Sequence, residues 1–217
     1  RSFLQKGLLP GDEVMVAGLG RELRIYQELT ADPARMLKAL DALESDPDIR
    51  MRGDNRTLEN FRRLAELREF AGSSPAFGQE TYNRMAGSFA QQDRPRILRT
   101  LASLRAVVAS LHSGTGRKEL FFLTDGFPAD PEALYGAPSD AASLEPEILR
   151  LSREAGAAQV AIHTVSTLGL ARDGSVEALV ERSASRTLSA FSLGTGGVAY
   201  RNSNDFLPPL ERVERET

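Results

Sequence analysis

The residues best placed to do chemistry follow a short apolar run, in the stretch "KELFFLTDGFPAD", where Thr124, Asp125 and Gly126 come in order. A carboxylate at the end of a buried strand can hold a hard cation together with hydroxyl groups, since Mg²⁺ usually takes one or two carboxylates and keeps several waters. The glycine lets the chain turn sharply after it. The alternative is that Asp-Gly only turns the chain at the surface. Asp125 is therefore either a metal ligand, with Thr124 beside it, or a turn residue.

A second pair of hydroxyl side chains, Ser166 and Thr167, follows the next apolar run, "VAIHTV". From residue 94 onward helical and strand patterns alternate, which predicts a parallel sheet covered on both faces. We expect "KELFFLT" and "VAIHTV" to be adjacent, parallel, central strands of this sheet. Ligands bind outside the carboxyl ends of such strands, so both sets of polar residues are predicted to meet at one edge.

The elements before and after these strands have recognisable signals. Asp32 and Pro33 suit the N-cap and first position of a helix, and Gly114 and Gly116 suit the end of a long one. The predicted elements are the end of a helix near 1–9, an antiparallel hairpin of strands near 12–20 and 22–30, helices near 32–43, 94–113, 144–158 and 175–190, and a short strand after the Gly turn near 194–197.

Residues 45–93 differ from the rest in composition. They are polar, rich in Arg and Glu, and hold only short helical runs. We interpret them as a helical insertion at the periphery of a single domain that spans residues 1–217, without a core of its own. The stretch from Gly72 to Pro75 is expected to break the insertion. An Arg/Glu-rich face at 50–69 is either solvated or a docking surface.

Composition excludes several classes of protein. The chain has 217 residues, a net charge of −3 and no Cys, which gives no basic surface for nucleic acid, no disulfide and no thiolate metal site. No run of about 18 apolar residues predicts a membrane span. Neither a Gly-x-Ser-x-Gly elbow nor a P-loop occurs, so we expect no enzyme. Of the two histidines, His163 suits a core imidazole, and His112 suits a helix C-terminus.

Four stretches, taken in order, resemble the von Willebrand factor A domain family, and more narrowly its bacterial branch common in acidobacterial proteins. They are "LLPGDEVMVAGLGRELRIYQELTADPARMLKALDAL", "GRKELFFLTDGF", "AGAAQVAIHTV" and "LSAFSLGTGGVAY". The resemblance covers most of the chain outside 45–93. It implies an α/β, doubly wound, mostly parallel, Rossmann-like sheet with one antiparallel edge strand.

The resemblance also implies a metal-ion-dependent adhesion site. The family builds it from an Asp-x-Ser-x-Ser loop after the first strand, a Thr in a second loop and an Asp in a third, and Asp125 occupies the third position. The first motif is not found in this sequence, and we expect the chain to lack the first strand that precedes it. Ser73, Ser74 and Thr81 lie in the interval of the second motif. The site is therefore expected to be partial, binding Mg²⁺ or Mn²⁺ weakly or not at all.

Two functions follow from the resemblance. The first is an adhesion or interaction module that binds a protein ligand, or another domain of the same protein, with or without the metal. The second is a structural or assembly domain of a larger envelope protein with a degenerate metal site, and a hydrolase is a distant third. The family suggests a secreted or periplasmic location. The sequence just before Arg1 would discriminate between the first two functions.

Overall fold

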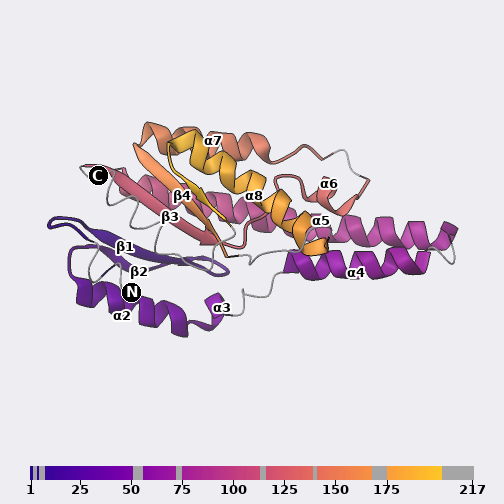
Figure 1. The fold of residues 1–217 in the computed structure, drawn as a ribbon, viewed down its shortest axis with the longest axis horizontal. Coiled ribbons are helices and arrows are strands. Elements are labelled where there is room, and N and C mark those ends of the chain that lie inside the picture. Colours follow the sequence, from indigo (N-terminus) through magenta and orange to yellow (C-terminus); the bar gives the residue numbers. More distant parts are fainter. Residues whose placement is uncertain are drawn as a thin grey trace. The chain divides into compact units, whose positions relative to one another are not determined.

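The computed structural model describes residues 1, 4, 8–50, 56–71, 75–112, 116–138, 141–167 and 175–201. They fall into two compact units, one up to residue 50 and one from residue 56 to residue 201. Figure 1 shows the helices and strands of both units. The predicted helix near 1–9 and the predicted break from Gly72 to Pro75 lie mostly outside the described residues, and the closing stretch "DFLPPLERVERE" lies wholly outside them.

The first unit is a hairpin followed by helices. Strands β1 (Val14–Leu19) and β2 (Leu23–Thr30) pair antiparallel, as predicted. Asp32 caps α2 (Pro33–Ser45) by accepting a hydrogen bond from the backbone N–H of Ala34 at 2.9 Å, and Pro33 begins the helix, which confirms the predicted start. A one-turn helix, α3 (Pro47–Arg50), follows.

The second unit contains a parallel sheet of three strands in the order β3-β4-β5. Its strands are β3 (Lys118–Thr124), β4 (Val160–Ser166) and β5 (Ala199–Tyr200). The predicted adjacency and parallel pairing of β3 and β4 are confirmed, but the expectation that β3 is central is wrong. β4 takes the central position, and β3 is an edge strand of this sheet, where Leu123 is 59% exposed. An apolar run alone could not distinguish the two positions.

Helices of the second unit extend further than the sequence indicates. They are α4 (Arg56–Ala71), α5 (Pro75–Leu111), α6 (Pro131–Tyr135), α7 (Glu145–Ala157) and α8 (Val176–Thr195). The predicted start of the long helix at residue 94 is wrong, because α5 begins at Pro75 and continues through Pro95. Proline suits the first turn of a helix, so Pro95 is compatible with a helix that starts at residue 94. The short α6 lies between the strand "KELFFLT" and the helix predicted near 144–158, where the sequence predicts no element.

One hydrophobic cluster, called the sheet core here, covers one face of the parallel sheet. Its buried members are Ile97, Leu101, Leu104 and Val108 of α5, Ile148, Leu151 and Ala155 of α7, Phe191 of α8, and Val160 and Ile162 of β4, with Phe127, Leu144 and Ala158 from the connections. Leu120 and Phe122 of β3 pack against it. Alternate residues of a strand share a face, so the side of β3 and β4 that carries residues 120, 122, 160 and 162 faces these helices.

A second cluster, the bundle core, joins α4, the first half of α5 and α6. It comprises Leu64, Ala86, Phe89, Ala90 and Tyr135. Tyr135 donates a hydrogen bond to the buried carboxylate of Asp93 at 2.5 Å, and burial and that carboxylate together raise the pKa of Tyr135. Helices within 45–93 therefore share a core with α6, and the expectation that this stretch lacks a core is wrong. Its reading as an insertion in a single domain stays a prediction.

The described strands form one antiparallel and one parallel sheet, so the fold is mixed α/β. None of the helices in the described ranges combines the length and apolar composition needed to cross a membrane.

Candidate functional site

The carboxyl ends of β3 and β4 lie next to one another, as the sequence predicts. Thr124, the last residue of β3, is the register partner of Ser166, the last residue of β4. One residue further along, the backbone N–H of Thr167 donates to the carbonyl oxygen of Thr124 at 2.9 Å. The parallel pairing therefore continues beyond the strands and holds the two hydroxyl-bearing ends together. This edge is called the carboxyl-end site below.

The turn after β3 is tightly constrained. Gly126 has a φ of +81°, which favours glycine, and its N–H donates to Thr124 Oγ1 at 3.0 Å. A Cβ at this position would lie only 2.6 Å from Ala184 Cβ, so the turn packs directly on α8. Asp125 lies between these two fixed residues and is half-buried. Local hydrogen bonding and a helix contact thus hold the carboxylate at the strand end.

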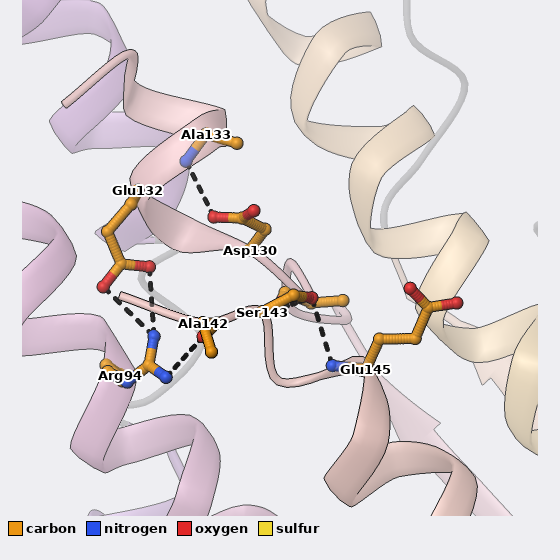
Figure 2. Close-up of polar contacts among 8 residues, drawn as sticks. Arg94, Asp130, Glu132, Ala133, Ala142, Ser143 and Glu145 are labelled. Atoms are coloured by element: carbon orange, nitrogen blue, oxygen red, sulfur yellow. Dashed lines mark hydrogen bonds and ion pairs between the residues drawn. The ribbon is translucent and has the colours of Figure 1, made fainter. Parts of the chain in front are cut away.

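The connection that follows the turn is also fixed, as Figure 2 shows. The Arg94 guanidinium donates to both carboxylate oxygens of Glu132, at 3.2 and 3.3 Å, and to the carbonyl oxygen of Ala142 at 2.5 Å. Asp130 caps α6 by accepting from Ala133 N–H at 2.8 Å. Because Arg94 belongs to α5, the loop that leaves Asp125 is anchored to the longest helix of the unit.

α8 runs alongside β4 with hydroxyl groups on the side that meets the strand. Thr164 Oγ1 lies 3.1 Å from Ser192 Oγ and donates to the carbonyl oxygen of Leu188 at 3.2 Å. The backbone N–H of Ile162 donates to Thr195 Oγ1 at 2.9 Å. Helix numbers fall from 195 to 188 as strand numbers rise from 162 to 164, so α8 is antiparallel to β4.

Two buried hydroxyl groups of α8 have no hydrogen-bond partner among the described residues. They are Ser185 Oγ and Thr187 Oγ1, in residues that are 4% and 2% exposed. Buried hydroxyls are normally satisfied, and an orphaned one calls for an explanation such as a bound water or ion. Sequence analysis missed Ser185, because serine on a helix gives no signal before its neighbours are known.

The histidines behave as the sequence predicts for structural residues. His163 is buried in β4, with Nε2 2.6 Å from Glu119 Oε2 and Nδ1 accepting from Val198 N–H at 3.2 Å. Phe121 stacks on its ring. Because Nδ1 is an acceptor, Nε2 carries the proton and donates to the carboxylate. His112 is exposed, directly after α5.

The residues considered for a second metal motif do not join the site. Ser73 and Ser74 are outside the described residues, and Thr81 lies within α5, not in a loop. Across the described ranges, no group of three or more His, Cys, Asp or Glu side chains could hold a metal ion. The carboxyl-end site therefore offers one carboxylate and several hydroxyls. That donor set fits a hard cation that keeps most of its water, and it does not fit a dehydrated, tightly held ion.

Comparisons with protein-family models, with curated proteins and with solved structures found no match to this chain.

Proposed function

We propose that this chain is a protein-binding module of the von Willebrand factor A type, with a weak divalent-cation site at the carboxyl end of its parallel sheet. The observation that carries the proposal is the placement of Asp125. It follows an edge strand of a parallel sheet, beside Thr124 and Ser166, in a turn that Gly126 and α8 hold in place. Ligands of open parallel sheets bind at this edge.

The parallel order β3-β4-β5 supports the parallel part of the doubly wound sheet that the resemblance implies. The antiparallel pair β1-β2 forms a separate two-stranded sheet in the first unit. In this proposal the outer edge of β3 is where the family's first strand pairs. An apolar strand at the edge of a sheet, such as "LFFL", is the kind of surface that another strand covers.

In such a module Asp125 would supply the negative charge of the site, and Thr124 and Ser166 would supply neutral oxygens. A cation held there would keep net positive charge, with which the site would attract an acidic group of a protein ligand. A single carboxylate gives little affinity, since Mg²⁺ gives up its waters reluctantly. We therefore propose binding in the millimolar range for Mn²⁺ and Mg²⁺, on the order expected for a site with so few charged ligands.

A titration with Mn²⁺, in which EPR reports the free ion, tests this proposal. The wild-type chain is compared with Asp125→Asn and with Glu66→Gln, which removes the same charge from an exposed position of α4. We expect Asp125→Asn to abolish the saturable binding and Glu66→Gln to leave it unchanged. Absence of saturable binding by a folded wild type, or equal losses in the two variants, contradicts a site at Asp125. Either result would favour the alternative, a structural or assembly domain with a degenerate site.

A further inference from the structure

We propose that Ser185 of α8 is an additional oxygen donor of the carboxyl-end site, facing the hydrated cation together with Asp125. This inference rests on the function proposed above and extends the site to an element outside the strand ends. It is carried by three observations: the register of α8 against β4, the contact of Ala184 with the Gly126 turn, and the unsatisfied hydroxyl of Ser185 itself.

The helix register places Ser185 at the level of the strand ends. Ser192 meets Thr164, and Ser185 lies seven residues earlier, on the same face of α8, about 10 Å along the axis. Because α8 is antiparallel to β4, this shift points toward the carboxyl end of the strand. A strand advances about 3.3 Å per residue, so Ser185 falls about three residues beyond Thr164, level with Thr167.

An independent contact gives the same placement. Ala184, the residue before Ser185, lies against the Gly126 turn so closely that a Cβ on the glycine would be 2.6 Å from its own. Gly126 is two residues beyond the end of β3 and one beyond Asp125. The register against β4 and the contact with the turn after β3 therefore both place this turn of α8 beside the carboxyl end of the sheet. Ala184 lies toward β3, and Ser185 lies on the helix face that packs along β4.

The position of Ser185 relative to β4 explains why its hydroxyl has no partner among the described residues. Ser192 and Thr195, further along the same face, are both hydrogen-bonded to β4. Ser185 lies where the strand has ended, and its Oγ is buried without a partner among the described residues. A hydroxyl oxygen there can accept from a water of the cation's shell or coordinate the ion itself. A hydrated cation held there would satisfy a group that the described residues leave unpaired.

Thr187 provides a matched control within the same helix. Its hydroxyl is also buried and unpaired in the described structure, but two residues turn a helix by about 200°, so it lies on roughly the opposite side of α8 from Ser185. Removing either hydroxyl, by Ser185→Ala or Thr187→Val, deletes an unsatisfied buried group, and neither variant is expected to lose stability without the ion. The two variants thus differ only in their position relative to the site.

Mn²⁺ affinity, measured by EPR titration, separates the possibilities. We expect Ser185→Ala to weaken binding roughly tenfold, as loss of a supporting donor does at metal sites, and Thr187→Val to bind like wild type. If Asp125→Asn abolishes binding but Ser185→Ala does not weaken it, the role of Ser185 is refuted while the proposed function stands. Equal weakening by both α8 variants also refutes it, since the effect would then come from the helix as a whole. No saturable binding by wild type refutes both proposals.

Discussion

The two ends of the β3–β4 pair differ in whether their buried polar groups have partners within the described part of the chain. Near the amino end, Glu119 accepts a hydrogen bond from His163 and forms an ion pair with Arg117, and the ring of Phe121 stacks on the imidazole. The other ring nitrogen accepts from Val198. Glu119 Oε1 accepts no hydrogen bond from the described residues, but it is the oxygen that forms the ion pair with Arg117. The imidazole and both carboxylate oxygens therefore have partners within the chain, and this end of the pair is self-sufficient.

At the carboxyl end, by contrast, the described residues leave a buried polar group without a partner. Thr124 accepts the N–H of Gly126, and Asp125 follows it, but Ser185 is left buried and unpaired in the described structure. A buried polar group without a partner costs about 1–3 kcal/mol. The comparison shows that burial of polar residues does not by itself mark a functional site. The informative feature is a polar group whose partner the described fold does not supply.

The largest effect in this comparison is expected at the self-sufficient end. A Cβ on Gly197 would lie 2.1 Å from the carbonyl oxygen of Ile162, so Gly197→Ala must separate the chain before β5 from β4. We expect a loss of about 3 kcal/mol in the free energy of unfolding, measured by urea denaturation. The control is Gly87→Ala, in open space within α5, which should gain about 0.5–1 kcal/mol. A loss below about 1 kcal/mol for Gly197→Ala would contradict the close packing.

Removal of the buried imidazole should have the next largest effect. His163→Leu deprives Glu119 of a charge-assisted hydrogen bond and Val198 N–H of its acceptor, and should cost about 2 kcal/mol. His112→Leu changes an exposed residue and should stay within about 0.5 kcal/mol of wild type. Mn²⁺ binding should be unchanged in both. Loss of Mn²⁺ binding in a folded His163→Leu variant would show that the amino end of the β3–β4 pair affects cation binding at the carboxyl end.

At the carboxyl end, the Gly126 turn should affect stability and binding together. Gly126→Ala forces alanine into a positive φ and against Ala184, with an expected cost of about 2 kcal/mol and loss of Mn²⁺ binding. Gly136 also has a positive φ, +65°, but a Cβ there would meet only Tyr82 Oη, at 3.5 Å. Gly136→Ala should therefore cost about 1 kcal/mol and leave binding intact. Similar losses in the two variants would mean that the contact with α8 is unimportant.

The smallest effect concerns an exposed ion pair at the start of α8. Arg62 donates to Glu177 at 2.7 Å, and this hydrogen bond, followed by those from the residue's own N–H and from Ser175, lowers the pKa of Glu177 from 4.5 to about 2. A depressed carboxyl pKa contributes stability above pH 4.5, and the contribution is lost as the pH falls toward 2. In an NMR titration, Arg62→Met should move the pKa of Glu177 back toward 4.5. An unchanged pKa would show that the pair does not persist in solution.

Elements with local signals could be predicted from the sequence. The Asp32 cap, the hairpin and the parallel pairing of β3 with β4 rest on neighbouring residues or on short apolar runs. The edge position of β3 could not be predicted, because an apolar run suits any strand whose faces are covered. The early start of α5 was missed because Pro95 is tolerated in the helix interior.

The part of the candidate site that has a local signal in the sequence could also be predicted. Thr124 and Asp125 stand directly after a strand, and the order of helices and strands places such residues at the carboxyl edge. Ser185 is 60 residues further along the chain than Asp125, and only the register of α8 against β4 relates it to the strand ends. Long-range contacts of this kind leave no local pattern in a sequence.

The most direct test of the account is a map of where a divalent ion binds. Mn²⁺, added at substoichiometric amounts to ¹⁵N-labelled wild-type chain, broadens the amide signals of residues close to it. The account predicts the strongest broadening at Thr124 to Gly126, at Ser166 and Thr167, and at Ser185, with distinctly weaker broadening around Glu119 and His163. Broadening that is spread over the exposed carboxylates, or centred on Glu119, would contradict a cation site at the carboxyl end of the parallel sheet.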